Sequence, residues 1–149
     1  MIIAERPLVA VLDNPQFDNY AWDLVAKILS DKGLKQRYCA LGLKCTKWDM
    51  DSRDLSLERR ISKRHSGCTR EFIRSVFSVV ATNNIGYQDS NGECVGHGIY
   101  PILSRANHSC NPNAIYASGD TTTKEVRLIA SRAIEAGESI TWNYPGFAE

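Results

Sequence analysis

Residues 104–116 of this 149-residue chain read SRANHSCNPNAIY, a run crowded with short polar side chains around one proline. Asn, Ser and Pro favour turns, because their side chains bond nearby backbone amides or fix a bend. The run therefore suits neither an ordinary helix nor an ordinary strand. Asn107, His108 and Cys110 add donors, acceptors and a soft metal ligand within a few residues, which makes this run the first candidate for a functional site.

The overall composition indicates one globular domain, residues 1–149, and we expect a monomer. Hydrophobic residues make up 43% of the chain, which is enough to bury a core. Eighteen basic and seventeen acidic residues give a net charge of +1, which argues against a protein that grips nucleic acid through its phosphates. We therefore expect no direct nucleic-acid partner.

The cysteines and the amino-terminal segment indicate a soluble protein of the nucleus or cytoplasm. Five cysteines are scattered without a C-x-x-C pair, which disfavours a disulfide framework and a self-contained zinc module. The opening segment reads MIIAERPLVAV, and its charges at Glu5 and Arg6 followed by Pro7 predict a strand, not a signal peptide. No run approaches the ~18 apolar residues of a membrane span, so we expect no membrane partner.

The first half of the chain is predicted to be helical. Trp22, Val25 and Leu29 recur at helical spacing, and a second apolar face repeats further along at Phe72 and Val76. The predicted segments are a helix that stops at Gly33, a weaker helix over 34–43, a loop over 47–56, and a helix over 69–83 capped by Thr69. We interpret residues 13–82 as a helical insertion within the domain.

The second half is predicted to contain short strands, because glycines interrupt it too often for long helices. Residues 117–131 suit a hairpin whose turn carries Gly119 and Asp120, with Val126, Leu128 and Ala130 on one face. A turn over 135–137 then leads to a final strand in which Ile140 and Trp142 share a face. The predicted fold class is α+β.

Several chemistries are open for the run around His108. Its side chains alone form a polar turn cluster, which is a common and purely structural feature. Zinc needs four ligands, and one Cys with one His supplies only half of them. A catalytic pair of Cys110 and His108 lacks a third residue to orient the imidazole. None of these readings uses the sequence that follows the run.

The run and its downstream partner together resemble the paired signature of SET domains, the protein-lysine methyltransferases that use S-adenosylmethionine. Residues 107–113 read NHSCNPN, and AIEAGESITWNY follows at residues 133–144 with the family's order and spacing. Upstream, residues 83–110 are similar to the matching stretch of the SET-and-MYND group and of small fungal SET proteins. The segment IIAERPL near the amino end is similar to a strand of that group. The resemblance implies a SET-type β-fold of short strands whose carboxyl-terminal part passes the NHSC segment in a pseudoknot-like crossing.

The resemblance also implies a role for individual residues. Asn107 and His108 would hold S-adenosylmethionine, Asn83 would add a polar contact to the same cofactor, and Tyr144 would be the catalytic residue beside the transferred methyl group. The partner would be a protein that presents a lysine, either a histone or a non-histone protein. Further walls of the lysine channel would come from an aromatic set: Tyr87, Tyr100, Tyr116 and Trp142.

The implied reaction needs positioning more than strong acid or base catalysis. The sulfonium of the cofactor is already activated, so the protein must align a neutral lysine amine with the methyl carbon. A free lysine has a pKa of about 10.4, and a narrow, dry, aromatic-lined channel favours its neutral form. Tyr144 would supply one wall of that channel and a hydroxyl group.

Three parts of the family pattern have no match in these residues. They are the Gly-x-Gly strand before IIAERPL, the MYND zinc module and the cysteines of a post-SET segment. We therefore expect an amino-terminally incomplete SET domain with no metal, in which Cys110 is an orphan zinc-ligand position and a buried free thiol. Three interpretations stay open: a lysine methyltransferase, a degenerate non-catalytic SET domain that acts as a protein-interaction module, and a purely structural domain.

Overall fold

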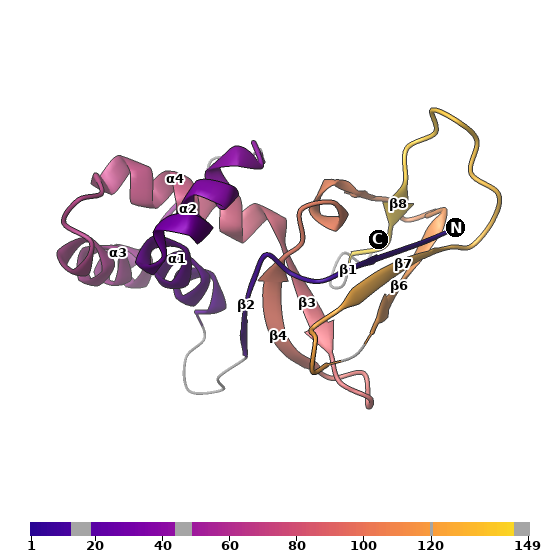
Figure 1. Cartoon of the computed structure of the whole chain (residues 1–149), viewed down its shortest axis with the longest axis horizontal. Coiled ribbons are helices and arrows are strands. Elements are labelled where there is room, and N and C mark those ends of the chain that lie inside the picture. Colours follow the sequence, from indigo (N-terminus) through magenta and orange to yellow (C-terminus); the bar gives the residue numbers. More distant parts are fainter. Residues whose placement is uncertain (13–18, 44–48, 120, 145–149) are drawn as a thin grey trace.

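The structure, a computed structural model, describes residues 1–12, 19–43, 49–119 and 121–144. Helices gather at one end of the molecule and strands at the other (Figure 1), which confirms the predicted α+β class. We call α1–α4, within residues 20–83, the helical half. The strands, within residues 2–12 and 84–142, form the strand half.

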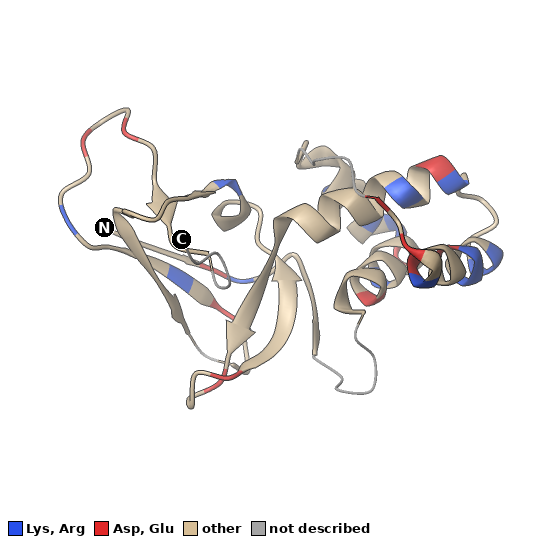
Figure 2. Ribbon diagram, turned by 180° about the vertical axis from the view of Figure 1, so that it is seen from behind, with Lys and Arg blue, Asp and Glu red and all other residues tan. Residues whose placement is uncertain are grey.

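The helical half consists of four helices that bury apolar faces against one another. Their bounds are α1 (Tyr20–Ser30), α2 (Lys32–Ala40), α3 (Ser52–Arg64) and α4 (Arg70–Asn83). Trp22 stacks on Phe77 across the α1–α4 contact, with ring centroids 4.2 Å apart. Ile28, Ile73 and Val80 are fully buried in the same cluster. Figure 2 shows that Lys, Arg, Asp and Glu are concentrated on the helices at this end of the molecule.

Side-chain caps set where three of these helices begin. The Asp31 carboxylate accepts from the Leu34 amide at 2.9 Å, and Asp51 accepts from the Asp54 amide at 2.7 Å. Thr69 Oγ1 accepts from the Phe72 amide at 3.2 Å, as predicted. Each cap satisfies a backbone donor that the first turn of a helix leaves without a partner.

Two sequence-based helix boundaries were wrong, both because of these caps. Gly33 does not stop a helix; α1 ends at Ser30, and Gly33 is the second residue of α2. Asp31 separates the two helices because it is extended, with φ −118°, and caps the second one. The predicted loop over 47–56 is helical from Ser52 onward, since the Asp51 cap starts α3 there.

The strand half contains two three-stranded antiparallel sheets. One has the order β1–β7–β6 and the other the order β2–β4–β3. The strand bounds are β1 (Ile2–Glu5), β2 (Val9–Leu12), β3 (Asn84–Gln88), β4 (Cys94–Ile99), β6 (Ala114–Ser118) and β7 (Val126–Ala130). The predicted amino-terminal strand is therefore two strands, which belong to different sheets.

The predicted hairpin is confirmed as the pair β6–β7. Val126 and Leu128 are buried, Ala130 is half-buried, and the alternating Arg127 and Ile129 are exposed. Gly119 donates its amide to the Glu125 carbonyl at 2.8 Å and closes the described part of the turn. The other predicted turn residue, Asp120, lies outside the described residues.

A short parallel pair joins the NHSC segment to the carboxyl-terminal part of the chain. The strand β5 (Asn107–His108) lies beside β8 (Thr141–Trp142). The turn before β8 is confirmed, since Glu138 donates its amide to the Glu135 carbonyl at 3.0 Å. The final strand is shorter than predicted, because Ile140 falls outside it. This pairing brings together the two signature segments, as the resemblance implied.

The sheet β2–β4–β3 separates two apolar clusters. Val9 and Ile99 face the helical cluster, whereas Ala10 and Ile85 face a second cluster rich in aromatic residues. Within the described ranges, no helix has the length and apolar character needed to cross a bilayer.

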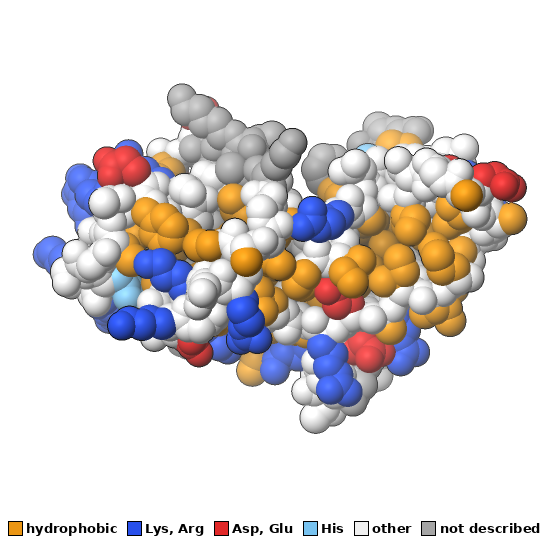
Figure 3. Space-filling view, turned by 45° about the horizontal axis from the view of Figure 1, so that its top comes forward, with side chains coloured by type: hydrophobic (Ala, Val, Ile, Leu, Met, Phe, Trp, Pro, Cys, Tyr) orange, Lys and Arg blue, Asp and Glu red, His pale blue; other side chains and the backbone are white. Residues whose placement is uncertain are grey.

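Some apolar side chains of the strand half stay at the surface. Ile2, Ile129 and Ile115 are in register across β1, β7 and β6, with exposed fractions of 63%, 37% and 58%. Figure 3 shows one face of the molecule, on which hydrophobic side chains gather over the strand half at the right. The outer face of this sheet is therefore partly apolar.

Candidate functional site

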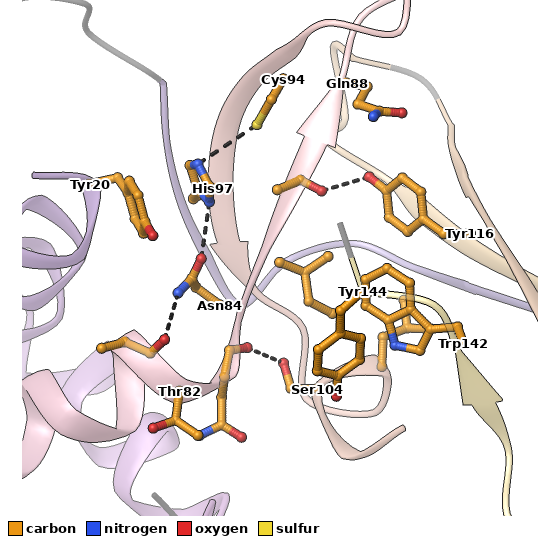
Figure 4. Close-up of a pocket in the computed structure, with 15 residues that line it drawn as sticks. Tyr20, Thr82, Asn84, Gln88, Cys94, His97, Ser104, Tyr116, Trp142 and Tyr144 are labelled. Atoms are coloured by element: carbon orange, nitrogen blue, oxygen red, sulfur yellow. Dashed lines mark hydrogen bonds between the residues drawn. The ribbon is translucent and has the colours of Figure 1, made fainter. Parts of the chain in front are cut away.

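A pocket of about 550 Å³ lies where the end of α4, the strands β3 and β4, and the segment after β8 meet (Figure 4). Aromatic rings of Tyr20, Tyr116, Trp142 and Tyr144 contribute to its walls. No Lys, Arg, Asp or Glu is among the described residues that line it. The described lining is therefore rich in aromatic rings and has neither carboxylates nor Lys or Arg side chains.

Tyr144 is held at the pocket wall by its backbone and its side chain. Its hydroxyl donates to the Ala106 carbonyl at 2.6 Å, and its amide donates to His108 Nδ1 at 3.1 Å. Burial raises the pKa of the Tyr144 hydroxyl above its ordinary value, so the group stays protonated at neutral pH. This tyrosine is a fixed neutral hydroxyl and not a base.

His108 supports Tyr144 from outside the lining of the pocket. Because Nδ1 accepts from the Tyr144 amide, the hydrogen of a neutral His108 is on Nε2. That nitrogen lies 3.1 Å from Cys110 Sγ. Cys110 is exposed, so the prediction of a buried thiol was wrong; it lies in a loop that follows β5 at the surface.

The structure brings Asn83 and Tyr144 together but keeps Asn107 apart. Asn83 lines the pocket at the end of α4, where its Nδ2 donates to the Val79 carbonyl at 2.8 Å. Ser104 Oγ donates to the Asn83 carbonyl at 2.7 Å and ties this end of α4 to the turn before β5. Asn107 is exposed on β5 and is not part of the lining. The cofactor roles assigned to these residues stay predictions.

Trp142 carries a buried polar group that has no hydrogen-bond partner in the described part of the chain. Its ring is only 5% exposed, stacks on Tyr116 at 5.2 Å and lines the pocket. Among the described residues, nothing accepts a hydrogen bond from its buried Nε1. A buried donor without an acceptor costs about 1–3 kcal/mol. A ligand with an acceptor atom at this position would remove that cost.

The other aromatic candidates divide between the pocket and the core. Tyr116 lines the pocket and donates its hydroxyl to the Gly86 carbonyl at 2.6 Å. Tyr87 and Tyr100 are core residues outside the lining, with hydroxyls that donate to the Val11 and Lys124 carbonyls at 3.1 and 2.7 Å. Burial raises the pKa of the Tyr100 hydroxyl, so that group is neutral as well.

Two supporting residues were missed by the sequence reasoning. Asn113 is 2% exposed; its Nδ2 donates to the Ser139 carbonyl at 2.9 Å and its Oδ1 accepts from the Thr141 amide at 2.9 Å. It therefore fixes the segment that leads into β8. The Glu5 carboxylate accepts from the amides of Ile102 and Leu103 at 3.0 and 2.9 Å. One sign of Asn113 was present in the sequence, since it lies in the polar run of residues 104–116. That its side chain is buried is visible only in the structure.

A comparison with known protein families matches the SET domain over residues 14–145. The chain belongs to the SET domain family. The match includes both signature segments and the helical half that precedes them in the chain. The predicted family and its SET-type fold are therefore confirmed.

Three curated relatives of this SET domain are lysine methyltransferases by name. N-lysine methyltransferase SMYD2-B of Xenopus laevis is 31% identical over 99 residues, 66% of the chain and 22% of the relative. Histone-lysine N-methyltransferase Smyd1 of Mus musculus is 32% identical over 88 residues, 52% of the chain and 18% of the relative. Histone-lysine N-methyltransferase SMYD3 of Mus musculus is 39% identical over 69 residues, 46% of the chain and 15% of the relative.

The matches place this SET domain in a family of protein-lysine methyltransferases, as the motif resemblance implied. The chain spans about a fifth of the length of the curated relatives it matches. The comparison therefore identifies the family of the domain, while the activity of this chain has to be argued from its own residues.

Proposed function

We propose that this SET domain is an S-adenosylmethionine-dependent protein-lysine N-methyltransferase and that its reaction takes place in the pocket beside Tyr144. The observation that carries the proposal is an aromatic pocket whose described lining has no Lys, Arg, Asp or Glu, together with a Trp142 Nε1 that has no acceptor among the described residues. Buried donors are almost always satisfied in proteins, and an exception in a side chain that lines a pocket points to a ligand.

The described residues of the pocket fit the cofactor. A volume of about 550 Å³ falls within the range of about 300–1,000 Å³ that is typical of small-molecule sites. Aromatic faces attract cations, so the rings of Tyr116, Trp142 and Tyr144 suit a sulfonium. Trp142 Nε1 would donate to an oxygen or nitrogen of the cofactor, and the Asn83 amide would add a polar contact. We retain Asn107 and His108 as proposed cofactor contacts, because their strand β5 pairs with β8, which carries Trp142 of the pocket wall.

The bound cofactor would supply an activated methyl group, and the protein would supply position and a dry environment. The Tyr144 hydroxyl already donates to Ala106, so its oxygen is available to accept an N–H of the substrate amine. Its raised pKa keeps it from acting as a base at neutral pH. Tyr144 would therefore orient the lysine amine toward the methyl carbon.

The lack of charged groups in the pocket would help the substrate lysine lose its proton. An ammonium group loses hydration in such a site and gains no carboxylate partner from the described lining, so its neutral form is favoured. The substrate would be a histone or a non-histone protein with an accessible lysine. The names of the relatives include both histone-lysine and general lysine enzymes, and the site of action would be the nucleus or cytoplasm.

The test is methyl transfer from labelled S-adenosylmethionine to histones and to an unrelated lysine-rich protein. We expect label in substrate lysines, and a loss of at least about tenfold in rate for Tyr144→Phe. Tyr100→Phe is the matched control, because it removes a buried tyrosine hydroxyl outside the pocket and should leave the rate unchanged in folded protein.

Two other outcomes would contradict the proposal. Cofactor binding without transfer to any protein would favour the non-catalytic SET domain that acts as an interaction module. A rate that falls equally in Tyr144→Phe and Tyr100→Phe would mean that the loss comes from stability and not from the position of the hydroxyl.

A further inference from the structure

A thiol, an imidazole and an amide are aligned on the wall of the pocket formed by β3 and β4 (Figure 4). Cys94 Sγ lies 3.7 Å from His97 Nε2, and His97 Nδ1 lies 3.0 Å from Asn84 Oδ1. The antiparallel pairing of β3 and β4 creates this alignment, since Cys94 and His97 are on one strand and Asn84 is on the other. The three side chains form a continuous chain of contacts.

The orientation of the Asn84 amide is fixed by its other contacts. Its Nδ2 donates to the carbonyls of Val80 and Ala81 at 3.0 and 3.1 Å, at the end of α4. Those two oxygens require a donor, so the amide oxygen has to be the atom that faces His97. An amide oxygen only accepts, and His97 Nδ1 must therefore carry a hydrogen.

This arrangement leaves the lone pair of a neutral His97 on Nε2, facing the Cys94 thiol. Tyr20 fixes the plane of the His97 ring, because the two rings stack with their centroids 3.7 Å apart and an interplanar angle of 9°. The thiol also lies 3.5 Å from the Gly96 carbonyl, which accepts a hydrogen bond but cannot take the proton at neutral pH. Among the described residues, His97 is a base within reach of Cys94.

The backbone makes room for the sulfur at this position. A Cβ built on Gly86 would lie 2.9 Å from Cys94 Sγ, closer than real Cβ contacts allow. Glycine at this position of β3 therefore leaves the space that the thiol occupies. Cys94 itself is exposed, so a reagent can reach it from the pocket or from solvent.

We propose that Cys94 is an activated nucleophile and a site of covalent modification by uncharged α,β-unsaturated carbonyl compounds, with His97 as its base and Asn84 as the residue that positions the imidazole. The Cys94 proton passes to His97 Nε2, and the sulfur bonds to the β-carbon of the reagent. The electrons of the C=C π bond move toward the α-carbon, which then takes the proton from His97. The product is a thioether, and the addition needs no oxidant and has no leaving group.

The lining of the pocket favours this class of reagent. Apolar side chains such as Ile85, Leu103 and Trp142 share the pocket with Cys94, and the described lining carries no charged side chain. A small uncharged molecule would therefore enter without losing strong hydration. Once attached to Cys94, it would occupy part of the same pocket that Tyr144 lines.

The chain contains an internal control, a second cysteine–histidine pair in which the histidine has the opposite tautomer. Cys110 is also exposed and also beside a histidine, at 3.1 Å. In that pair, however, His108 Nδ1 is used as an acceptor by the Tyr144 amide, so Nε2 presents a hydrogen to the sulfur and not a lone pair. His108 cannot take the Cys110 proton at that nitrogen, whereas His97 can take the proton of Cys94.

The test is limited reaction of the full chain with N-ethylmaleimide, followed by peptide mass spectrometry of each cysteine over time. We expect Cys94 to react at least about tenfold faster than Cys110 and Cys39, which are also exposed. In His97→Gln the Cys94 rate should fall about tenfold while the Cys110 rate is unchanged. Asn84→Ala removes the acceptor from His97 Nδ1 and should lower the Cys94 rate while the Cys110 rate is unchanged.

Two results would overturn the proposal. One is a Cys94 rate in the unaltered chain no higher than that of Cys110, a comparison that needs no variant to fold. The other is a Cys94 rate that His97→Gln leaves unchanged. Because the readout is the mass of an adduct, the test is independent of whether the chain transfers methyl groups.

Discussion

The helical half and the strand half of this SET domain satisfy their buried polar groups in different ways. In the helical half the one buried carboxylate described, Glu58, is paired with both Arg70 and Arg74. In the strand half the buried Nε1 of Trp142 has no partner among the described residues, and it lines a pocket. The buried carboxylate of the helical half is thus satisfied within the protein, whereas the indole N–H of Trp142 lacks an acceptor in the described residues and could be satisfied by a ligand.

The first prediction compares a side chain buried in the helical half with an exposed side chain of the strand half. Ile28 is completely buried in α1, and Ile28→Ala should lower the free energy of unfolding by about 4 kcal/mol, because it leaves a cavity. Urea unfolding measures this loss. Ile115→Ala makes the same chemical change at a side chain of the strand half that is 58% exposed, and it should cost under about 1 kcal/mol. Equal losses at both sites would contradict the contrast between them.

The second prediction tests whether the strand half depends on one amide. Asn113→Ala removes the contacts to Ser139 and Thr141, and it should cost about 3 kcal/mol since it leaves buried backbone groups without partners. The exposed neighbour Asn111 is the control, and Asn111→Ala should change the unfolding free energy by under about 0.5 kcal/mol. If the loss of unfolding free energy at Asn113 were as small as that at Asn111, Asn113 would not be what fixes the segment that leads into β8.

The third prediction concerns the buried carboxylate of the helical half. Burial of Glu58 favours its neutral form, but hydrogen bonds from Arg70 and Arg74 outweigh that effect and hold its pKa below the ordinary value. Removing both arginines leaves Glu58 without these partners, and the double alanine variant should lose about 2 kcal/mol at neutral pH. Chemical denaturation checks the loss. Glu58→Gln should cost less, because both arginines are half exposed and can turn to solvent.

The fourth and smallest prediction is a pH effect at the surface of the strand half. The Arg132 guanidinium, the Asn113 amide and the Glu135 backbone lower the pKa of Glu138 from 4.5 to about 2. The charged form of Glu138 is the one that the folded state favours. Its contribution is therefore complete above pH 4.5 and is lost as the pH falls toward 2.

Urea unfolding of the unaltered chain and of Glu138→Gln across this pH range tests the assignment. The difference in unfolding free energy between the two proteins should be largest near neutral pH and should shrink below pH 4.5. A difference that stays constant with pH would mean that Glu138 does not titrate as described.

Local sequence patterns predicted the parts of the fold that depend on neighbours along the chain. The alternation of Val126 and Leu128 gave the hairpin, and Thr69 gave the start of α4. The helix boundary near Gly33 failed, because the cap at Asp31 outweighed the usual preference of glycine for helix ends. A side chain that accepts from the amide three residues later decides where a helix begins more directly than the presence of a glycine decides where one ends.

The sequence predicted the site only where a family motif already related residues that are far apart along the chain. The motif related the NHSC segment to Tyr144, and β5 and β8 do lie side by side. Nothing in the sequence related Cys94 and His97 to Asn84, since the strand register brings them together. The sequence also gave no sign of the buried Trp142 Nε1, which has no acceptor within the described ranges, because its burial depends on both strand pairing and aromatic packing.

The most direct test of the central claim is calorimetric titration of the chain with S-adenosylmethionine, alongside Trp142→Phe. We expect saturable binding of one cofactor by the unaltered chain. Trp142→Phe keeps a ring but loses the N–H, and it should bind about tenfold more weakly, since one hydrogen bond contributes about 1 kcal/mol or somewhat more. Absence of binding at millimolar cofactor, or equal affinity in the two proteins, would contradict the account.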